Sequence, residues 1–152
     1  MTDIVSQKTR SRMMSGIRNK DTAPEMIIRR GLHKRGYRYR LHSAALPGKP
    51  DLVLKKHEAV IFVNGCFWHG HECRLFKWPR TRAGWWRQKI SRTRERDAEN
   101  ILQLKSAQWR VMVIWECALK GADKLSITQV IDTLDRWLES GSMEGCIRCN
   151  RE

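Results

Sequence analysis

The sequence lacks any long apolar run of the kind that a membrane-spanning helix requires. No stretch approaches the roughly eighteen predominantly apolar residues needed to cross a bilayer. The first twelve residues, MTDIVSQKTRSR, also lack the apolar segment that follows the basic start of a secretion signal. We therefore expect no transmembrane helix, no secretion and no membrane partner.

Acidic residues are scarce relative to basic ones. The 152-residue chain has 30 Lys and Arg against 16 Asp and Glu, a formal net charge of +14. An excess of that size destabilises a compact fold by self-repulsion unless a polyanion neutralises it. The excess is also uneven: residues 74–96 carry nine basic residues and one acid, whereas residues 121–152 carry four basic and six acidic ones. One face is thus predicted to meet phosphates, with nucleic acid favoured over an acidic membrane surface.

Five cysteines without a secretion signal indicate a reducing compartment, where metal ligation is commoner than disulfide formation. We expect a cytoplasmic, nucleoid-associated protein. Its length suits one domain with a real core. Residues 1–20 are polar and basic, typical of a flexible arm that contacts DNA; residues 21–140 carry the folded domain; residues 141–152 are expected to form a disordered tail.

The apolar pattern predicts a helix, three strands, a helix, a strand and a helix, in that order. The predicted elements are a helix at 21–36, strands at 37–41, 51–54 and 59–63, a helix at 82–107, a strand at 109–115 and a helix at 126–140. Strand 59–63 is apolar throughout, as a strand covered on both faces would be. Helices on both faces favour an α/β sandwich with a mixed sheet. Asp97 falls on the apolar stripe of the long helix, and no local pattern explains it.

The segment GCFWHGHEC (65–73) places two cysteines and two histidines within eight residues. Thiolate and imidazole are the ligands that Zn²⁺ prefers, and a structural zinc site takes four of them. Cys117, directly after strand 109–115, can supply another thiolate, as could the pair Cys146 and Cys149. We favour Cys117, because the end of a strand is held in place whereas a tail is not. The predicted zinc ligands are Cys66, His71, Cys73 and Cys117.

Two residues beside these ligands are candidates for catalysis. His69 is left over from the ligand set, and it is either an idle imidazole or a general acid or base suited to neutral pH. Asp51 follows Pro50 at the start of a strand, where an Asp is often only a turn or cap residue. A carboxylate there can also share Mg²⁺ with a backbone carbonyl of the neighbouring strand.

Aromatic residues lie among the basic ones. Phe67, Trp68 and one of Trp85 and Trp86 are surrounded by arginine and lysine, which is typical of side chains that stack on bases or wedge between them. The alternative is a small hydrophobic cluster beneath the loop.

Three segments together resemble the very short patch repair endonucleases of bacteria: LPGKPD (46–51), GCFWHGHEC (65–73) and WECAL (115–119). The resemblance extends from about Thr9 to Leu138. It implies a restriction-endonuclease-like α/β fold, a mixed β-sheet flanked by helices. It also implies an enzyme that acts as a monomer on double-stranded DNA, finds the T:G mismatch left by deamination of 5-methylcytosine, and nicks the strand 5′ of the mismatched T.

The resemblance assigns roles to individual residues. Asp51 and the backbone carbonyl of Val63 would hold Mg²⁺, His69 would be the catalytic imidazole, and Glu25 would bind water attached to the metal. Members often carry Thr at the position of Val63 and His at that of Asn64, and a carbonyl ligand survives the first change.

The resemblance also names the residues that would enter the duplex and the metal ligands. Phe67, Trp68 and Trp86 would wedge beside the mismatch, and Met14 would enter from the other groove. The structural zinc ligands match those chosen above. The rival interpretations are a restriction enzyme that cuts both strands of matched DNA and a zinc module that binds DNA without cutting it.

Overall fold

The computed structural model of the protein describes residues 21–150, and within them three α-helices and five strands alternate. The elements are α2 (Ala23–Lys34), β1 (Arg40–Leu41), β2 (Leu52–Leu54), β3 (Ala59–Asn64), α3 (Ala83–Ser106), β4 (Arg110–Trp115), α4 (Ile127–Glu139) and β5 (Glu144–Ile147). Short 3₁₀ turns follow β2 and β4. The predicted arm at residues 1–20, with Met14, lies outside the described residues.

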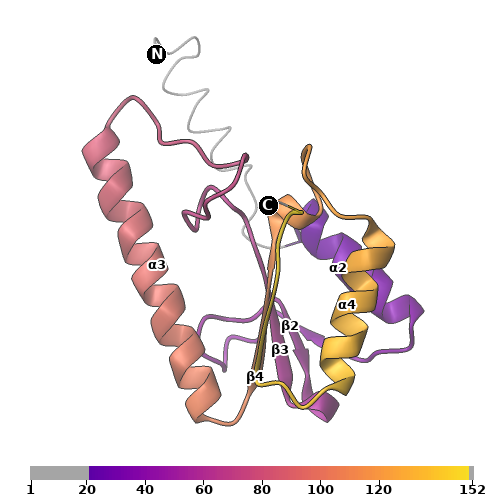
Figure 1. The fold of residues 1–152 in the computed structure, drawn as a ribbon. Coiled ribbons are helices and arrows are strands. Elements are labelled where there is room, and N and C mark those ends of the chain that lie inside the picture. Colours follow the sequence, from indigo (N-terminus) through magenta and orange to yellow (C-terminus); the bar gives the residue numbers. More distant parts are fainter. Residues whose placement is uncertain (1–20, 151–152) are drawn as a thin grey trace.

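The strands form one mixed sheet in the order β1-β2-β3-β4-β5. The first three strands are antiparallel neighbours, while β4 runs parallel to both β3 and β5. Figure 1 shows α3 on one face of the sheet and α2 with α4 on the other. The predicted α/β architecture, with a mixed sheet between helices, is confirmed.

Strand β3 contributes to both faces of the sheet, which explains why its residues 59–63 are all apolar. Ala59 and Ile61 belong to the core beneath α2 and α4, whereas Val60 belongs to the core beneath α3. Because both faces are covered by helices, every position of the strand favours an apolar side chain. The long helix α3 is anchored on this second core by Leu104.

Helix ends follow the local sequence. The Thr22 hydroxyl accepts a hydrogen bond from the backbone N–H of Glu25 at 3.4 Å, with Pro24 in the first turn. Ser126 and Gln129 form a reciprocal capping box at the start of α4, with bonds of 3.0 and 3.1 Å. These caps fix the residues at which the two helices begin.

The strand expected at 37–41 is shortened to Arg40–Leu41. The hydroxyl of Tyr37 donates to Asp135 on α4 and that of Tyr39 donates to the carbonyl of Arg29 on α2. The two tyrosines therefore tie this segment to the helices, and only its last two residues pair with β2.

The C-terminal segment differs from the expected disordered tail, because Glu144–Ile147 forms β5 against β4. Ile147 is buried, and Gly145 lies so close to Met112 and Trp137 that an added Cβ would come within 3.0 Å of both side chains. The strand is stabilised by these distant contacts rather than by its own sequence. Among the helices between residues 21 and 150, none combines the length and apolarity needed to cross a membrane.

Candidate active site

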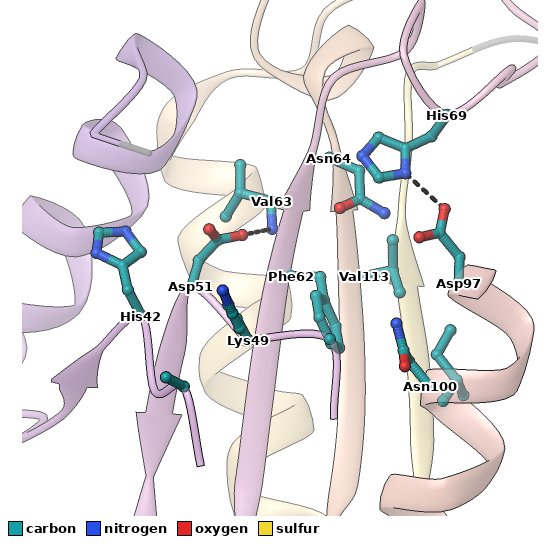
Figure 2. A pocket seen from close by; sticks show the side chains of 13 residues that line it. His42, Lys49, Asp51, Phe62, Val63, Asn64, His69, Asp97, Asn100 and Val113 are labelled. Atoms are coloured by element: carbon teal, nitrogen blue, oxygen red, sulfur yellow. Dashed lines mark hydrogen bonds and ion pairs between the residues drawn. The ribbon is translucent and has the colours of Figure 1, made fainter. Parts of the chain in front are cut away.

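A cavity of about 480 Å³ opens where β2 begins and β3 ends. Asp51 reaches it from the residue before β2, Val63 and Asn64 from the end of β3, His69 from the following loop and Asp97 from α3. Figure 2 shows these side chains around one space, with Asn64 between Val63 and His69. Of the three residues predicted to take part in catalysis, Asp51 and His69 thus line the same cavity, whereas Glu25 is not among its lining residues.

Antiparallel pairing fixes Asp51 at the cavity. Leu52 pairs with Ile61, so Asp51 lies beside the end of β3, and its Oδ2 accepts a hydrogen bond from the Val63 N–H at 2.7 Å. Burial, with a smaller contribution from the nearby Glu25 carboxylate, raises the pKa of Asp51 to about 7 against the opposing effect of the Val63 N–H. Two carboxylates in a buried place are an arrangement that a divalent cation stabilises.

The backbone carbonyl of Val63 is oriented toward β2, as its N–H is. In an antiparallel pair, the N–H and C=O of one residue point to the same neighbouring strand. The observed register, continued by two residues, sets Val63 opposite Pro50, which has no N–H to donate. The backbone oxygen of Val63 is therefore left for another partner beside Asp51, and the two oxygens fit a hard cation such as Mg²⁺.

The imidazole of His69 is held by a carboxylate from α3. Its Nδ1–H donates to Asp97 Oδ2 at 2.5 Å (Figure 2). Both residues line the cavity, so the second ring nitrogen, Nε2, is left for a group inside it. A carboxylate on one nitrogen fixes the tautomer and orientation of an imidazole that transfers protons at the other.

Asp97 was missed as a site residue by reasoning from sequence. Its position on the apolar stripe of α3 was the one signal, and the structure explains it: that stripe faces the sheet, and Asp97 lies where the stripe meets the cavity. A polar residue on the buried side of an amphipathic helix marks a site when a partner from elsewhere faces it.

The loop that carries His69 packs tightly on α3 at Gly70. This residue has a left-handed backbone (φ 62°), and a Cβ there would lie 2.5 Å from Ile90 Cγ2. Backbone bonds from His71 N–H to the Cys66 carbonyl (2.9 Å) and from His69 N–H to the Gly65 carbonyl (3.3 Å) close the loop on itself. Glycine is therefore required for the approach that brings His69 to Asp97.

The four predicted zinc ligands converge at the other side of this loop. One donor atom from each of Cys66, His71, Cys73 and Cys117 lies within 4.8 Å of the others. His71 Nδ1 is 3.5 Å from Cys66 Sγ and 3.7 Å from Cys117 Sγ. A tetrahedral zinc ion with ordinary bond lengths holds such donors about 3.5–3.8 Å apart, so the residues fit the metal.

The surroundings of the cluster suit thiolates bound to a cation. Burial raises the pKa of the Cys66 thiol well above its usual value. It also raises the pKa of the Cys117 thiol to about 11 and lowers that of His71 to about 4. These cysteines thus favour the neutral thiol unless a cation compensates the charge. The backbone N–H groups of Cys117 and Cys149 donate to sulfur at 3.3 Å, to Cys66 and Cys117 respectively. Backbone donors of this kind orient and support metal ligands.

Phe67, Trp68 and Trp86 form one half-buried aromatic cluster. Phe67 lies 5.2 Å from each of the two indoles, and these are 5.8 Å apart, measured between ring centroids. Trp78 and Trp85 flank the cluster and are more than 40% exposed. Each carries a guanidinium over its ring, from Arg87 and Arg82 respectively. Aromatic and cationic groups therefore share one surface beside the cavity.

Comparison with known proteins finds relatives that are named as DNA endonucleases. A family model described as DNA mismatch endonuclease Vsr matches residues 2–75. The chain is 42% identical to DNA mismatch endonuclease Vsr of Escherichia coli (strain K12), over 91% of this chain and 88% of the relative. It is also 42% identical to the type II nicking enzyme V.XorIIP of Xanthomonas oryzae pv. oryzae, over 87% of this chain and 98% of the relative. The type II nicking enzyme V.NaeI of Lentzea aerocolonigenes is 37% identical, over 87% of this chain and 80% of the relative.

Proposed function

The chain belongs to the family of Vsr DNA mismatch endonucleases, and on that premise we propose that it nicks DNA 5′ of the T in a T:G mismatch with the help of Mg²⁺. That it is a DNA endonuclease follows from the relatives, whose names are those of mismatch endonucleases and nicking enzymes. The observation that carries the mechanism is the convergence of Asp51 and the His69–Asp97 pair on one cavity. The mixed sheet, with its carboxylate at the start of β2, supports assignment to the restriction-endonuclease-like folds.

Asp51 and the Val63 carbonyl are the groups that would hold Mg²⁺, and Glu25 adds a third oxygen-bearing group nearby. Bound there, the cation would offset the negative charge that develops on the phosphate during hydrolysis. The Val63 N–H fixes one carboxylate oxygen of Asp51, so the carboxylate does not have to be oriented during the reaction.

His69 would transfer the proton. Its Nε2 takes a proton from a water molecule whose oxygen forms a new bond to phosphorus, while the bond between phosphorus and the departing sugar oxygen breaks. The imidazolium formed in this step is stabilised by Asp97, to which Nδ1–H is already bonded. The departing sugar oxygen would take a proton from solvent and His69 would return its proton to solvent, so that one phosphodiester and one water give a nicked strand.

Replacing Asp97 with Asn tests this pair. We expect the single-turnover nicking rate to fall about 100-fold, because an amide can stabilise the wrong tautomer and cannot offset the imidazolium charge. DNA affinity should stay within about twofold of the wild type. Glu99→Gln, an exposed acid on the same helix, is the matched control. A wild-type rate for Asp97→Asn would remove Asp97 from the mechanism.

The aromatic cluster would supply selectivity. Wedging a ring between base pairs costs a few kcal/mol per step, and the cost is lower where pairing is already poor. A T:G mismatch is therefore opened more readily than a matched pair. The cations over Trp78 and Trp85 would meet phosphates on either side of the opened step.

Trp68→Ala is expected to reduce the preference for T:G over C:G duplexes by roughly tenfold, because stacking on a base contributes about 1–3 kcal/mol. Equilibrium binding to the two duplexes at one salt concentration measures this ratio. Trp78→Ala removes an exposed indole outside the cluster and should weaken both complexes alike. An unchanged ratio in Trp68→Ala would show that the cluster only supports the loop.

We assign zinc to the group of Cys66, His71, Cys73 and Cys117, with a structural role. Three sulfurs and one nitrogen are a common structural zinc set, and the four residues leave no position open for a substrate. Cys66 precedes His69, and His71 and Cys73 follow it, so the group brackets the loop that presents His69, and this supports a role in holding that loop.

One assay tests the proposed function as a whole. Duplexes that differ only in a T:G or C:G pair are incubated with the protein, with and without Mg²⁺, and both strands are analysed by denaturing electrophoresis. We expect a single nick in the T-containing strand of the T:G duplex, dependent on the metal. Cleavage of both strands of the C:G duplex would instead identify a restriction enzyme, and binding without cleavage would identify a DNA-binding zinc module.

A further inference from the structure

Glu25 lies in a network of charged groups next to the cavity. Its side chain is 2% exposed, and each carboxylate oxygen has partners. Oε1 accepts from the backbone N–H of Asp21 at 3.2 Å. Oε2 accepts from Arg29 Nη1 at 3.2 Å and from His42 Nε2–H at 2.9 Å. The orientation of this buried carboxylate is therefore set by three donors.

The network does not require a metal ion of its own. Asp21, Glu25 and His42 bring donor atoms within 4.8 Å of one another, which is close enough for a cation. The guanidinium of Arg29 already lies there, 2.7 Å from the Asp21 carboxylate and 3.2 Å from that of Glu25. A fixed positive charge of the protein thus balances the two acids.

His42 is the member of the network that lines the cavity with Asp51. Figure 2 shows its ring beside the Asp51 side chain. The backbone N–H of His42 donates to the Asp51 carbonyl at 3.0 Å, so the residue is joined to Glu25 by its side chain and to Asp51 by its backbone. Its φ of 47° is in the left-handed region, which residues other than glycine seldom adopt. The two bonds hold it in that conformation.

We propose that His42 is a positioning residue that holds the Glu25 carboxylate near that of Asp51, so that the two acids act together on one divalent cation. The proposal rests on the proposed function, because it takes Asp51 as a metal ligand. Groups that orient metal-binding side chains typically change metal affinity or activity 10- to 100-fold when they are removed. The proposed role depends on the hydrogen bond from His42 Nε2–H to Glu25. Another side chain whose N–H reaches Glu25 should therefore be able to replace the imidazole.

Two substitutions separate this role from general support of the fold. His42→Leu removes the donor, whereas His42→Gln keeps a side-chain N–H that can reach Glu25. The metal probe is Mn²⁺, and free Mn²⁺ is counted by electron paramagnetic resonance in the absence of DNA. Nicking of the T:G duplex and DNA affinity without divalent cations are measured on the same proteins. His33→Leu, an exposed histidine on α2, is the control.

We expect His42→Leu to bind Mn²⁺ roughly tenfold more weakly and to nick about tenfold more slowly, with DNA affinity and the control unchanged. His42→Gln should recover most of both losses. Should the Leu variant not fold, His42→Asn suits the left-handed backbone and has an amide too short to reach Glu25, so it replaces the Leu variant in the comparison.

Wild-type Mn²⁺ affinity in His42→Leu or His42→Asn would overturn the proposal. So would a His42→Gln variant that binds Mn²⁺ as weakly as those two variants. If the wild type does not nick the T:G duplex but Mn²⁺ binding still follows the donor at position 42, the proposed function fails while the positioning role stands.

Discussion

Asp51→Asn is expected to lower the rate of T:G nicking in Mg²⁺ by about 10⁴-fold, which corresponds to the several kcal/mol that a catalytic cation contributes. The amide oxygen can still accept the bond from the Val63 N–H, so the backbone around the cavity should keep its shape. The amide has no charge to hold the cation. The rate under single-turnover conditions, with protein in excess over a labelled duplex, measures the loss.

Two further measurements make the result specific. DNA affinity of Asp51→Asn should remain measurable and close to that of the wild type, and Asp132→Asn, an acid on α4 away from the cavity, should nick normally. Without divalent cations at pH 8, the Asp51 variant should also melt at a higher temperature than the wild type. The pKa of Asp51 is raised to about 7 by burial, so stability decreases as pH rises toward that value. Full nicking activity would refute the assignment of Asp51.

Cys73→Ser is expected to lose bound zinc and cooperative folding together. Structural zinc sites contribute on the order of 10 kcal/mol to the folding of small metal-binding peptides, so a domain of this size should not keep its native state without one. Zinc content by mass spectrometry and the thermal unfolding curve are measured on the same sample. A chelator added to the wild type should produce the same change.

Cys146 provides the matched control for this substitution. It is exposed and lies outside the cluster, so Cys146→Ser should keep its zinc and its melting temperature. A Cys73→Ser protein that is stable, metal-free and active would contradict the zinc assignment. Equal losses in both variants would show that thiol chemistry in general, rather than this ligand set, supports the fold.

Sequence reasoning anticipated the elements whose cause is local. The hairpin of β2 and β3, the long α3 and the capped α4 all follow from apolar periodicity and end signals, and they appear within a few residues of the predicted bounds. The convergence of Cys66, His71, Cys73 and Cys117 could be predicted for a similar reason, since three of the four residues lie within eight positions and their chemistry is distinctive.

The features that were missed depend on contacts between distant segments. Asp97 acquires a role only when α3 docks on the sheet and meets His69, 28 residues earlier in the chain. Strand β5 has four residues, including a glycine, and is held by Met112 and Trp137 from other elements. His42 was not singled out because its partner Glu25 lies on a helix, 17 residues away. Periodicity within one segment carries no information about such partners.

The close fit of Gly70 against α3 has a consequence for how this chain can change in length. Residues 66–73 begin and end with proposed zinc ligands, Cys66 and Cys73, and Gly70 between them lies tightly against Ile90. One residue inserted or deleted there would shift His69 along the helix and away from Asp97. Residues 74–82 carry no ligand and no member of the His69–Asp97 pair. Insertions and deletions should therefore be tolerated in the second stretch and eliminated from the first, and a library of such variants selected for nicking would reveal that boundary directly.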